Sequence, residues 1–385
     1  MFWILGGDAV VHALAAVVAF APLPWLATQF EHKEWAGLAF YDLIFPLFIF
    51  VSGVSMVFSL TRTIEQHGRT RAVIRVLFRT AVLLALGVFY SGGFTHAWPD
   101  VRLLGVLQRI GLAYGGAGLL FCFFKPRGLA VWAVALLVGY WALMTWVPIR
   151  DVQLDPKVMA AQLGSAGKPP TLEQVRALYE TTATHVTGRY EPGLNVSNHF
   201  DFEYLPGKKY DTYWDPEGIV STLPAIVTCL LGVFAGGLLR RRDLDDRKKV
   251  LHLVAAGVVA LTLGWLWHLQ FPVVKKLWTS SFVLVAGGWS ALLLALFYYI
   301  IDVVKWRAWS TPFVWIGMNA ITLYLLANLL RPRAVAQRFA GGSVQASLDA
   351  QVGAGVGNLV IALVGALLVF AIARFLYRRQ IFLRL

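Results

Sequence analysis

The stretch from Phe30 to Met56 contains the first residues whose types could do chemistry. His32 lies in a charged cluster, and an apolar run long enough to cross a bilayer follows directly. An imidazole can take or pass a proton near neutral pH, here at a membrane boundary. A solvated loop histidine is the alternative, but Trp35 and Tyr41 favour a loop folded back onto the protein. We therefore treat His32 as a candidate catalytic residue.

Two carboxylates could assist such an imidazole. Asp8 lies within the first apolar run, where a charged group is costly and normally faces a partner inside the protein. His12 follows four residues later on the same helical face, so Asp8 is either half of a structural Asp8–His12 pair or the group that orients a catalytic imidazole. Asp42 opens the next apolar helix, where the helix dipole also explains an aspartate. We place Asp42 in the substrate site.

A buried cation is expected near the start of another apolar run. Gln108 and Arg109 fall about a turn and a half into it, too deep for the guanidinium to reach water easily. One interpretation is a buried ion pair with Asp8 or Asp42. The other is binding of an anionic ligand, and on that interpretation both residues belong to a cofactor site.

Polar residues at other helix ends could line a substrate mouth. Asp215 is well placed to cap a helix, with Glu217 beside it. Lys275 lies near Trp278, where it could be an interfacial anchor or part of the mouth. Asn319 is an uncharged polar residue within an apolar run, for which interhelical hydrogen bonding is a sufficient explanation.

Composition assigns the 385-residue chain to the membrane proteins. It is 58% hydrophobic and only 14% charged, with a mean hydropathy of +0.64. The net charge of +13 is concentrated in short segments between apolar runs, which indicates membrane topology rather than nucleic-acid binding. Cys122 and Cys229 both lie in apolar runs, so no disulfide or metal site is expected. Because phosphate-loop, HExxH, GxSxG and CxxC motifs are absent from the sequence, an ATP-driven pump or a zinc protease is not expected.

The apolar runs predict an all-α bundle of about ten transmembrane helices forming one domain over residues 1–385. The basic loops, which include Arg75 and Arg79, place both termini in the cytoplasm; these two arginines could also hold cofactor phosphates. Residues 148–217 form the only long polar segment, predicted to be an extracytoplasmic cap between spans five and six. The predicted spans are about 1–20, 38–60, 74–94, 103–124, 129–147, 218–239, 250–269, 280–301, 312–330 and 352–373.

Five ordered blocks resemble a known family. They are EHKEWAGLAFYDLIFPLFIFVSGVSM, RLLGVLQRIGLAY, DPEGIVSTLPAIVTCLLGVFAG, PVVKKLWTSSFVL and TPFVWIGMNAITLYL. Together they resemble the membrane domain of heparan-alpha-glucosaminide N-acetyltransferases, most closely bacterial members associated with N-acetylglucosamine use. The family's active-site histidine carries over to His32, and a polar residue of its first helix, asparagine in the animal enzymes, falls at Asp8. The family's SLDxxRG block is missing, so we expect a first helix that is short at its start.

The resemblance implies acetyl transfer from cytosolic acetyl-CoA, across a bacterial inner membrane, to an amino sugar or glycan outside. His32 would be base or nucleophile, with Asp8 orienting it. The cofactor residues would be Gln108, Arg109, Arg75 and Arg79, and the substrate residues Asp42, Trp35, Glu217, Lys275, Trp278 and Asn319. No metal or nucleic-acid partner is expected, and a homodimer is left open. A sugar or amino-sugar permease and an O-acyltransferase of envelope polysaccharide are the alternatives.

Overall fold

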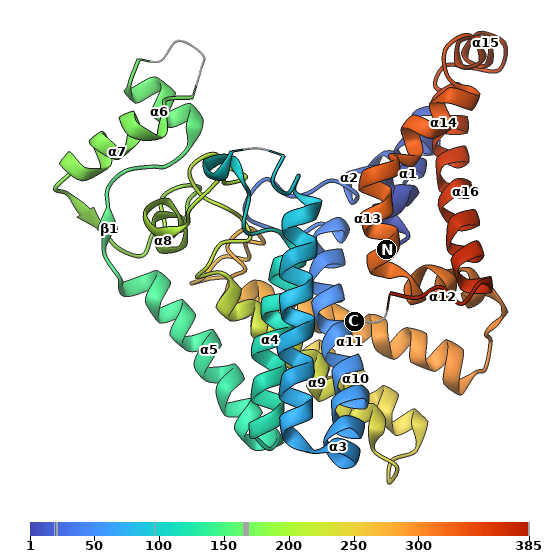
Figure 1. The fold of residues 1–385 in the computed structure, drawn as a ribbon, viewed down its shortest axis with the longest axis horizontal. Coiled ribbons are helices and arrows are strands. Elements are labelled where there is room, and N and C mark those ends of the chain that lie inside the picture. Colours follow the sequence, from blue (N-terminus) through green and yellow to red (C-terminus); the bar gives the residue numbers. More distant parts are fainter. Residues whose placement is uncertain (19, 21, 96, 165–168, 384–385) are drawn as a thin grey trace. The chain divides into compact units, whose positions relative to one another are not determined.

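The computed structural model describes residues 1–18, 20, 22–95, 97–164 and 169–383. The chain forms two compact units. The first comprises residues 1–33, 39–44 and 297–385, and the second comprises residues 34–38 and 45–296. Each unit is almost entirely helical, which confirms the predicted fold class (Figure 1).

The second unit is built on long apolar helices (Figure 1). The principal contacts are α4 with α9 and α5 with α9. Two short strands form one antiparallel pair, with Ile149 opposite Val186 and Arg150 opposite His185. Its elements are α3 (Ile44–Tyr90), η3 (Trp98–Asp100), α4 (Val106–Phe123), α5 (Pro126–Trp146), β1 (Ile149–Arg150), α6 (Pro156–Gln162), α7 (Leu172–Thr181), β2 (His185–Val186), α8 (Val196–Tyr204), α9 (Thr222–Arg240), α10 (Asp246–Trp267) and α11 (Ser280–Tyr298).

Helix α3 doubles back on itself at Gly68. Its backbone there has φ of +80°, a value that favours glycine, and the helical geometry is interrupted. In a straight helix Thr63 and Arg75 would be about 18 Å apart. Instead, the Arg75 guanidinium donates to the Thr63 hydroxyl at 3.1 Å. The predicted spans 38–60 and 74–94 therefore correspond to the two arms of one hairpin.

Close backbone contact joins α3 to α9. A Cβ atom added at Gly53 would lie 2.0 Å from the Cys229 carbonyl oxygen, and one added at Gly232 would lie 1.9 Å from the Phe50 carbonyl oxygen. Only glycine fits at these two positions. Small residues are a common way to bring membrane helices together, because hydrophobicity does not drive helices together within lipid.

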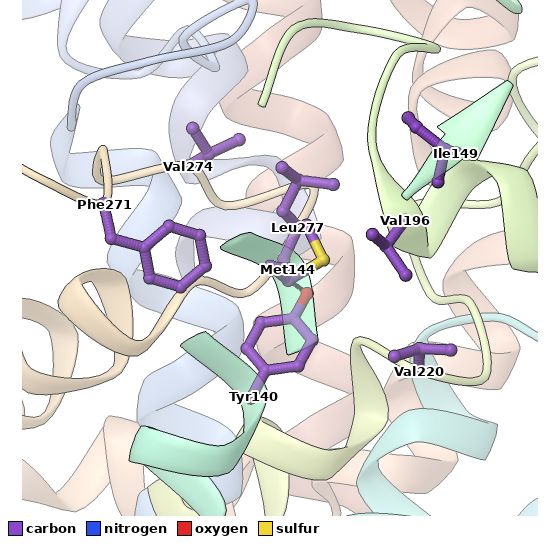
Figure 2. Close-up of a cluster of buried hydrophobic side chains, with 8 residues drawn as sticks. All are labelled: Tyr140, Met144, Ile149, Val196, Val220, Phe271, Val274 and Leu277. Carbon is purple, nitrogen blue, oxygen red and sulfur yellow. Dashed lines mark hydrogen bonds between the residues drawn. The ribbon is translucent and has the colours of Figure 1, made fainter. Parts of the chain in front are cut away.

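The segment 148–217 is attached to α5 by an apolar cluster (Figure 2). Tyr140 and Met144 of α5 pack with Ile149 of β1 and Val196 of α8. The Tyr140 hydroxyl also donates to the Leu277 carbonyl at 2.7 Å. The remaining members of the cluster are Val220, Phe271, Val274 and Leu277. The segment thus contains helices and a strand pair that share a core with the bundle.

The first unit gathers both ends of the chain around α16, which contacts α1, α12, α14 and α15. A buried cluster that includes Leu5, Ile316, Leu323 and Val369 forms its core. Its elements are η1 (Trp3–Gly7, a π-helix), α1 (Asp8–Val17), α2 (Pro22–Thr28), η2 (Phe40–Leu43), η4 (Tyr299–Val303), η5 (Ala308–Ser310), α12 (Thr311–Met318), α13 (Ala320–Leu330), α14 (Pro332–Ala340), α15 (Ser343–Gln351) and α16 (Val356–Arg378).

The predicted count of ten spans is not confirmed. Among the described residues, seven helices are long and apolar enough to cross a membrane, or eight if a bent pair forms one span. The first apolar helix, Trp3–Val17, is too short for this class, and the α3 hairpin counts once. The predicted span 312–330 is two helices, Ala308–Met318 and Ala320–Leu330, bent by 70°. Hydropathy alone did not reveal this bend, because the sequence stays apolar through it.

Candidate active site

His32 and Asp42 form a hydrogen-bonded pair in the first unit. The imidazole Nδ1 lies 2.8 Å from the Asp42 Oδ1 atom. Asp42 is only 1% exposed, whereas the His32 side chain is 54% exposed. A buried carboxylate therefore holds one ring nitrogen, and in the neutral tautomer that donates from Nδ1 the other nitrogen, Nε2, is a base.

Local hydrogen bonds hold Asp42 in place. Its Oδ2 atom accepts the backbone N–H of Ala39 at 3.0 Å and that of Lys33 at 3.3 Å. The backbone N–H of Tyr41 donates to the Gln29 carbonyl at 2.9 Å, and this hydrogen bond joins the two ends of the loop that contains His32. The carboxylate is thus fixed before it orients the imidazole, as the carboxylate of a catalytic triad is.

Asp8 reaches the same region through Tyr41. The Tyr41 hydroxyl donates to Asp8 Oδ2 at 3.0 Å, and Asp8 Oδ1 accepts the Ala9 N–H at 2.8 Å. The Tyr41 ring packs beside the His32 ring, with 4.8 Å between their centroids. Asp8 thus acts on the phenol that supports the imidazole, whereas Asp42 makes the direct contact.

A π-helical turn precedes Asp8 and positions it. Gly6 has φ of +121° within η1, and regular α-helix begins at Asp8. Such π-turns are frequent at functional sites. Asp8 also lines a cavity of about 260 Å³ within the first unit. The other lining residues are Ile4, Leu5, Gly6, Ala9, Ala327, Arg331, Pro332, Arg333, Ile361, Ala362, Gly365 and Ala366.

Gln108 and Arg109 are buried in the second unit, each 1% exposed. The Arg109 guanidinium donates to the Gly218 carbonyl at 3.3 Å and to the Ser221 hydroxyl, and it lies 5.0 Å from the Trp278 ring centroid. Neither expected ion pair partner, Asp8 or Asp42, belongs to this unit. Among the described residues, Gln108 Nε2 and Arg109 Nε have no hydrogen-bond partner.

The prediction that Asp215 caps the sixth span is wrong. Helix α9 begins at Thr222, with Ser221 as its N-cap residue. Asp215, which is 1% exposed, instead accepts two hydrogen bonds from Arg102, at 2.8 and 2.9 Å. Arg102 also binds Glu217 at 2.8 Å. A bidentate guanidinium satisfies this buried carboxylate better than the start of a helix seven residues away could, so Asp215 pairs with Arg102 and does not cap α9.

Electrostatics in this region are dominated by burial. Desolvation raises the pKa of Asp201, on α8, to about 7, although Oδ1 accepts the Ile219 N–H at 3.0 Å. Burial likewise raises the pKa of Glu217, opposed by the nearby Arg109 and Arg102. Hydrogen bonds and charge from Asp215 and Glu217 outweigh burial and raise the pKa of Arg102.

The other predicted site residues are distributed over both units. In the second unit, the Trp35 indole donates to the Tyr190 carbonyl at 2.8 Å, and Trp278 is buried with its indole bonded to Thr228 at 3.0 Å. Lys275 is half-buried beside Lys276, which pairs with Asp211. Arg79 lies 4.5 Å from the Tyr114 ring centroid, and Arg75 binds Thr63 as above. Asn319 belongs to the first unit, at the break between α12 and α13.

Sequence reasoning missed three residues that the structure brings into these networks: Tyr41 in its actual role, Arg102 and Asp201. Tyr41 was visible only as an aromatic neighbour of His32. Arg102 and Asp201 are ordinary polar residues in loops or on short helices, and their partners lie 113 and 18 positions away. The sequence alone carried no signal that joined them.

The fold and the site together define an all-α integral membrane protein with an exposed imidazole held by a buried carboxylate. A family model described as "Heparan-alpha-glucosaminide N-acetyltransferase, catalytic" matches residues 9–165, the range that contains His32, Tyr41 and Asp42. This match covers less than half of the chain and agrees with the resemblance that the five blocks carry.

Two curated relatives extend the match. The chain is 28% identical to heparan-alpha-glucosaminide N-acetyltransferase of Mus musculus over 335 residues and 27% identical to that of Homo sapiens over 334 residues. In each case the alignment covers 77% of this chain and 48% of the relative. The chain thus spans about half the length of the curated relatives it matches.

Proposed function

We propose that this protein is an N-acetyltransferase that moves an acetyl group from acetyl-CoA to the amino group of a glucosamine-type acceptor. The observation that carries the proposal is the His32–Asp42 pair, which lies within the segment that matches the family model. The names of the two relatives support the reaction type and the amino-sugar acceptor. The distribution of basic loops supports the sidedness that we propose: the donor on the cytosolic side of a bacterial inner membrane, the acceptor outside, and both termini cytoplasmic.

In the first route, His32 is a general base. The acceptor nitrogen attacks the thioester carbonyl carbon, the carbon–sulfur bond breaks, and Nε2 takes the proton that the amine loses. Asp42 holds the tautomer in which Nδ1 donates and Nε2 accepts, and it stabilises the imidazolium that forms. Tyr41, which is hydrogen-bonded to Asp8, packs against the His32 imidazole and limits the orientations of that ring.

In the second route, Nε2 is the nucleophile. It attacks the thioester carbon, the thiolate of coenzyme A leaves, and the acceptor amine then attacks the acetyl-imidazole. Both routes need the same tautomer, so both assign Asp42 the same role. Acid quench and mass spectrometry separate them, because only the second leaves an acetyl group on His32 when the acceptor is omitted.

The experiment that tests the function uses the purified chain in detergent with radiolabelled acetyl-CoA and glucosamine. Formation of labelled N-acetylglucosamine supports the proposal, and its loss in His32→Ala assigns the transfer to this site. A matched control is His252→Ala, which changes an exposed histidine of α10. Absence of any labelled product with the wild-type chain would reject the proposed reaction.

A permease is the second candidate, and the 70° break between Ala308–Met318 and Ala320–Leu330 favours it. Broken helices line the substrate sites of many transporters. Uptake of labelled glucosamine into vesicles without acetyl-CoA would identify a permease. Screening hydroxyl acceptors against amine acceptors distinguishes the O-acyltransferase alternative.

A further inference from the structure

The break between α12 and α13 contains an unsatisfied polar residue. Asn319 is 2% exposed, and neither its Oδ1 nor its Nδ2 atom has a hydrogen-bond partner among the described residues. It occupies the N-cap position of α13 but makes no capping hydrogen bond with its side chain. Three residues on, the buried Oγ1 atom of Thr322 likewise lacks a partner in the described part of the chain. We name Asn319 and Thr322 together the polar notch.

The polar notch is costly unless something fills it. Buried polar groups are nearly always hydrogen-bonded, and the penalty is greatest in the hydrocarbon layer, where water cannot substitute. The first turn of α13 adds backbone N–H groups that a helix start leaves without helical partners. A helix that breaks in mid-membrane and exposes such groups is a known way to hold a ligand.

The surroundings limit which ligand can enter. Ile316 and Leu323, on either side of Asn319, belong to the same buried apolar cluster as Leu5. A sugar has a hydroxyl on almost every carbon, so it would need many more hydrogen-bond partners than these apolar side chains offer. A narrow, mainly apolar chain with isolated amides needs only one acceptor and one donor at each amide, which a carboxamide supplies.

A cavity lies farther along the same helix, about two turns from Asn319. Asn319, Leu323 and Ala327 are spaced by four residues and lie on one face of α13. Ala327 and Leu5 line the cavity of about 260 Å³ that also contains Asp8. This cavity lies in the first unit, which also contains His32.

We propose that the polar notch binds an amide of the pantetheine arm of the acyl donor, with the Asn319 carboxamide pairing with the amide N–H and C=O and the Thr322 hydroxyl assisting. This inference rests on the proposed function, which supplies coenzyme A as the donor. The sequence predicts that Asn319 is among the residues that bind the sugar substrate. The polar notch would instead place it against the acyl donor. Asn319 is here a positioning residue for the donor.

The test measures ligand affinity by isothermal titration of the purified protein, with no dependence on turnover. The probes are coenzyme A, pantetheine, and adenosine 3′,5′-bisphosphate, which lacks the arm. The variants are Asn319→Ala and Thr322→Val, the second nearly isosteric. The matched control is Asn328→Ala, on an exposed position of the same helix. Melting temperature checks that each variant is folded.

We expect Asn319→Ala to weaken coenzyme A and pantetheine about tenfold, with a smaller loss for Thr322→Val, while the bisphosphate binds unchanged. Wild-type affinity for coenzyme A in both folded variants would overturn the assignment and leave the proposed function intact. If coenzyme A does not bind the wild-type chain, the donor in the proposed function fails; the notch is then judged by pantetheine alone. Pantetheine binding that Asn319→Ala abolishes supports it, and no pantetheine binding by wild-type protein overturns it.

Discussion

Replacing Asp42 by asparagine tests how the imidazole is held. The Asp42 carboxylate accepts from Nδ1 of His32 at 2.8 Å and from the Ala39 N–H at 3.0 Å. An asparagine has the same shape, and its carbonyl oxygen can keep the Ala39 bond. Its NH₂ group would then face Nδ1, so the ring would adopt the tautomer with the proton on Nε2. The nitrogen that must act as base or nucleophile would be blocked.

The expected cost is the loss of base or nucleophile function at Nε2. General-base catalysis contributes about 100- to 10,000-fold, and Asp42→Asn should lower kcat/KM for acetyl transfer by an amount in this range. Stability should change little, because the Ala39 N–H keeps its partner. Asp42→Ala is the contrasting variant: it leaves that buried N–H unpaired, so it should also lower the free energy of unfolding by about 1–3 kcal/mol.

The assay is initial-rate transfer of labelled acetyl from acetyl-CoA to glucosamine, with melting temperature recorded for each variant. A matched control is Asp349→Asn, which changes a carboxylate of α15 that also accepts a backbone N–H, that of Gly357 at 2.8 Å. The reasoning is refuted if folded Asp42→Asn transfers acetyl within threefold of the wild-type rate.

Three further predictions concern stability. Arg102→Gln should lower the free energy of unfolding by about 3 kcal/mol in a denaturant titration, because Asp215 would remain buried without its cation. Burial raises the pKa of Asp201 from 3.8 to about 7, so between these pH values the folded state keeps a proton that the unfolded state has lost. Relative to the folded state at pH 7, the protein should therefore be more stable near pH 4 by about 4 kcal/mol, and this extra stability should be lost as the pH rises to 7. Asp201→Asn should remove this loss when melting curves are compared across that range. Gly53→Ala should destabilise the α3–α9 contact, whereas Gly237→Ala, whose Cβ would meet no atom within 4 Å, should not; equal melting temperatures would contradict the packing argument.

Hydropathy and charge predicted the all-helical membrane fold because each depends on composition over about twenty residues. The basic segment between the predicted spans 38–60 and 74–94 contains the turn at Gly68, so these two arms were separated correctly. The break at Asn319 could not be predicted, because the sequence stays apolar on both sides of it. Span counting therefore gave one span where the structure has two helices.

The candidate site was predictable where its residues are close in sequence. His32 and Asp42 are ten positions apart, and the motif that contains both drew attention to them. Their direct pairing was not predicted, since Asp8 was expected to orient the ring. Only the folded loop, closed by Tyr41 on Gln29, shows which carboxylate touches the imidazole. Long-range pairs such as Arg102 with Asp215 depend on tertiary packing that a single sequence does not encode locally.

The central claim is that the His32 imidazole carries acetyl transfer. The most direct measurement is the single-turnover rate of acetyl transfer to glucosamine by His32→Ala in proteoliposomes, beside wild type and a variant with equal melting temperature. The account predicts a rate at least about 100-fold below wild type, with the protein still folded. Transfer at the wild-type rate by folded His32→Ala would contradict it.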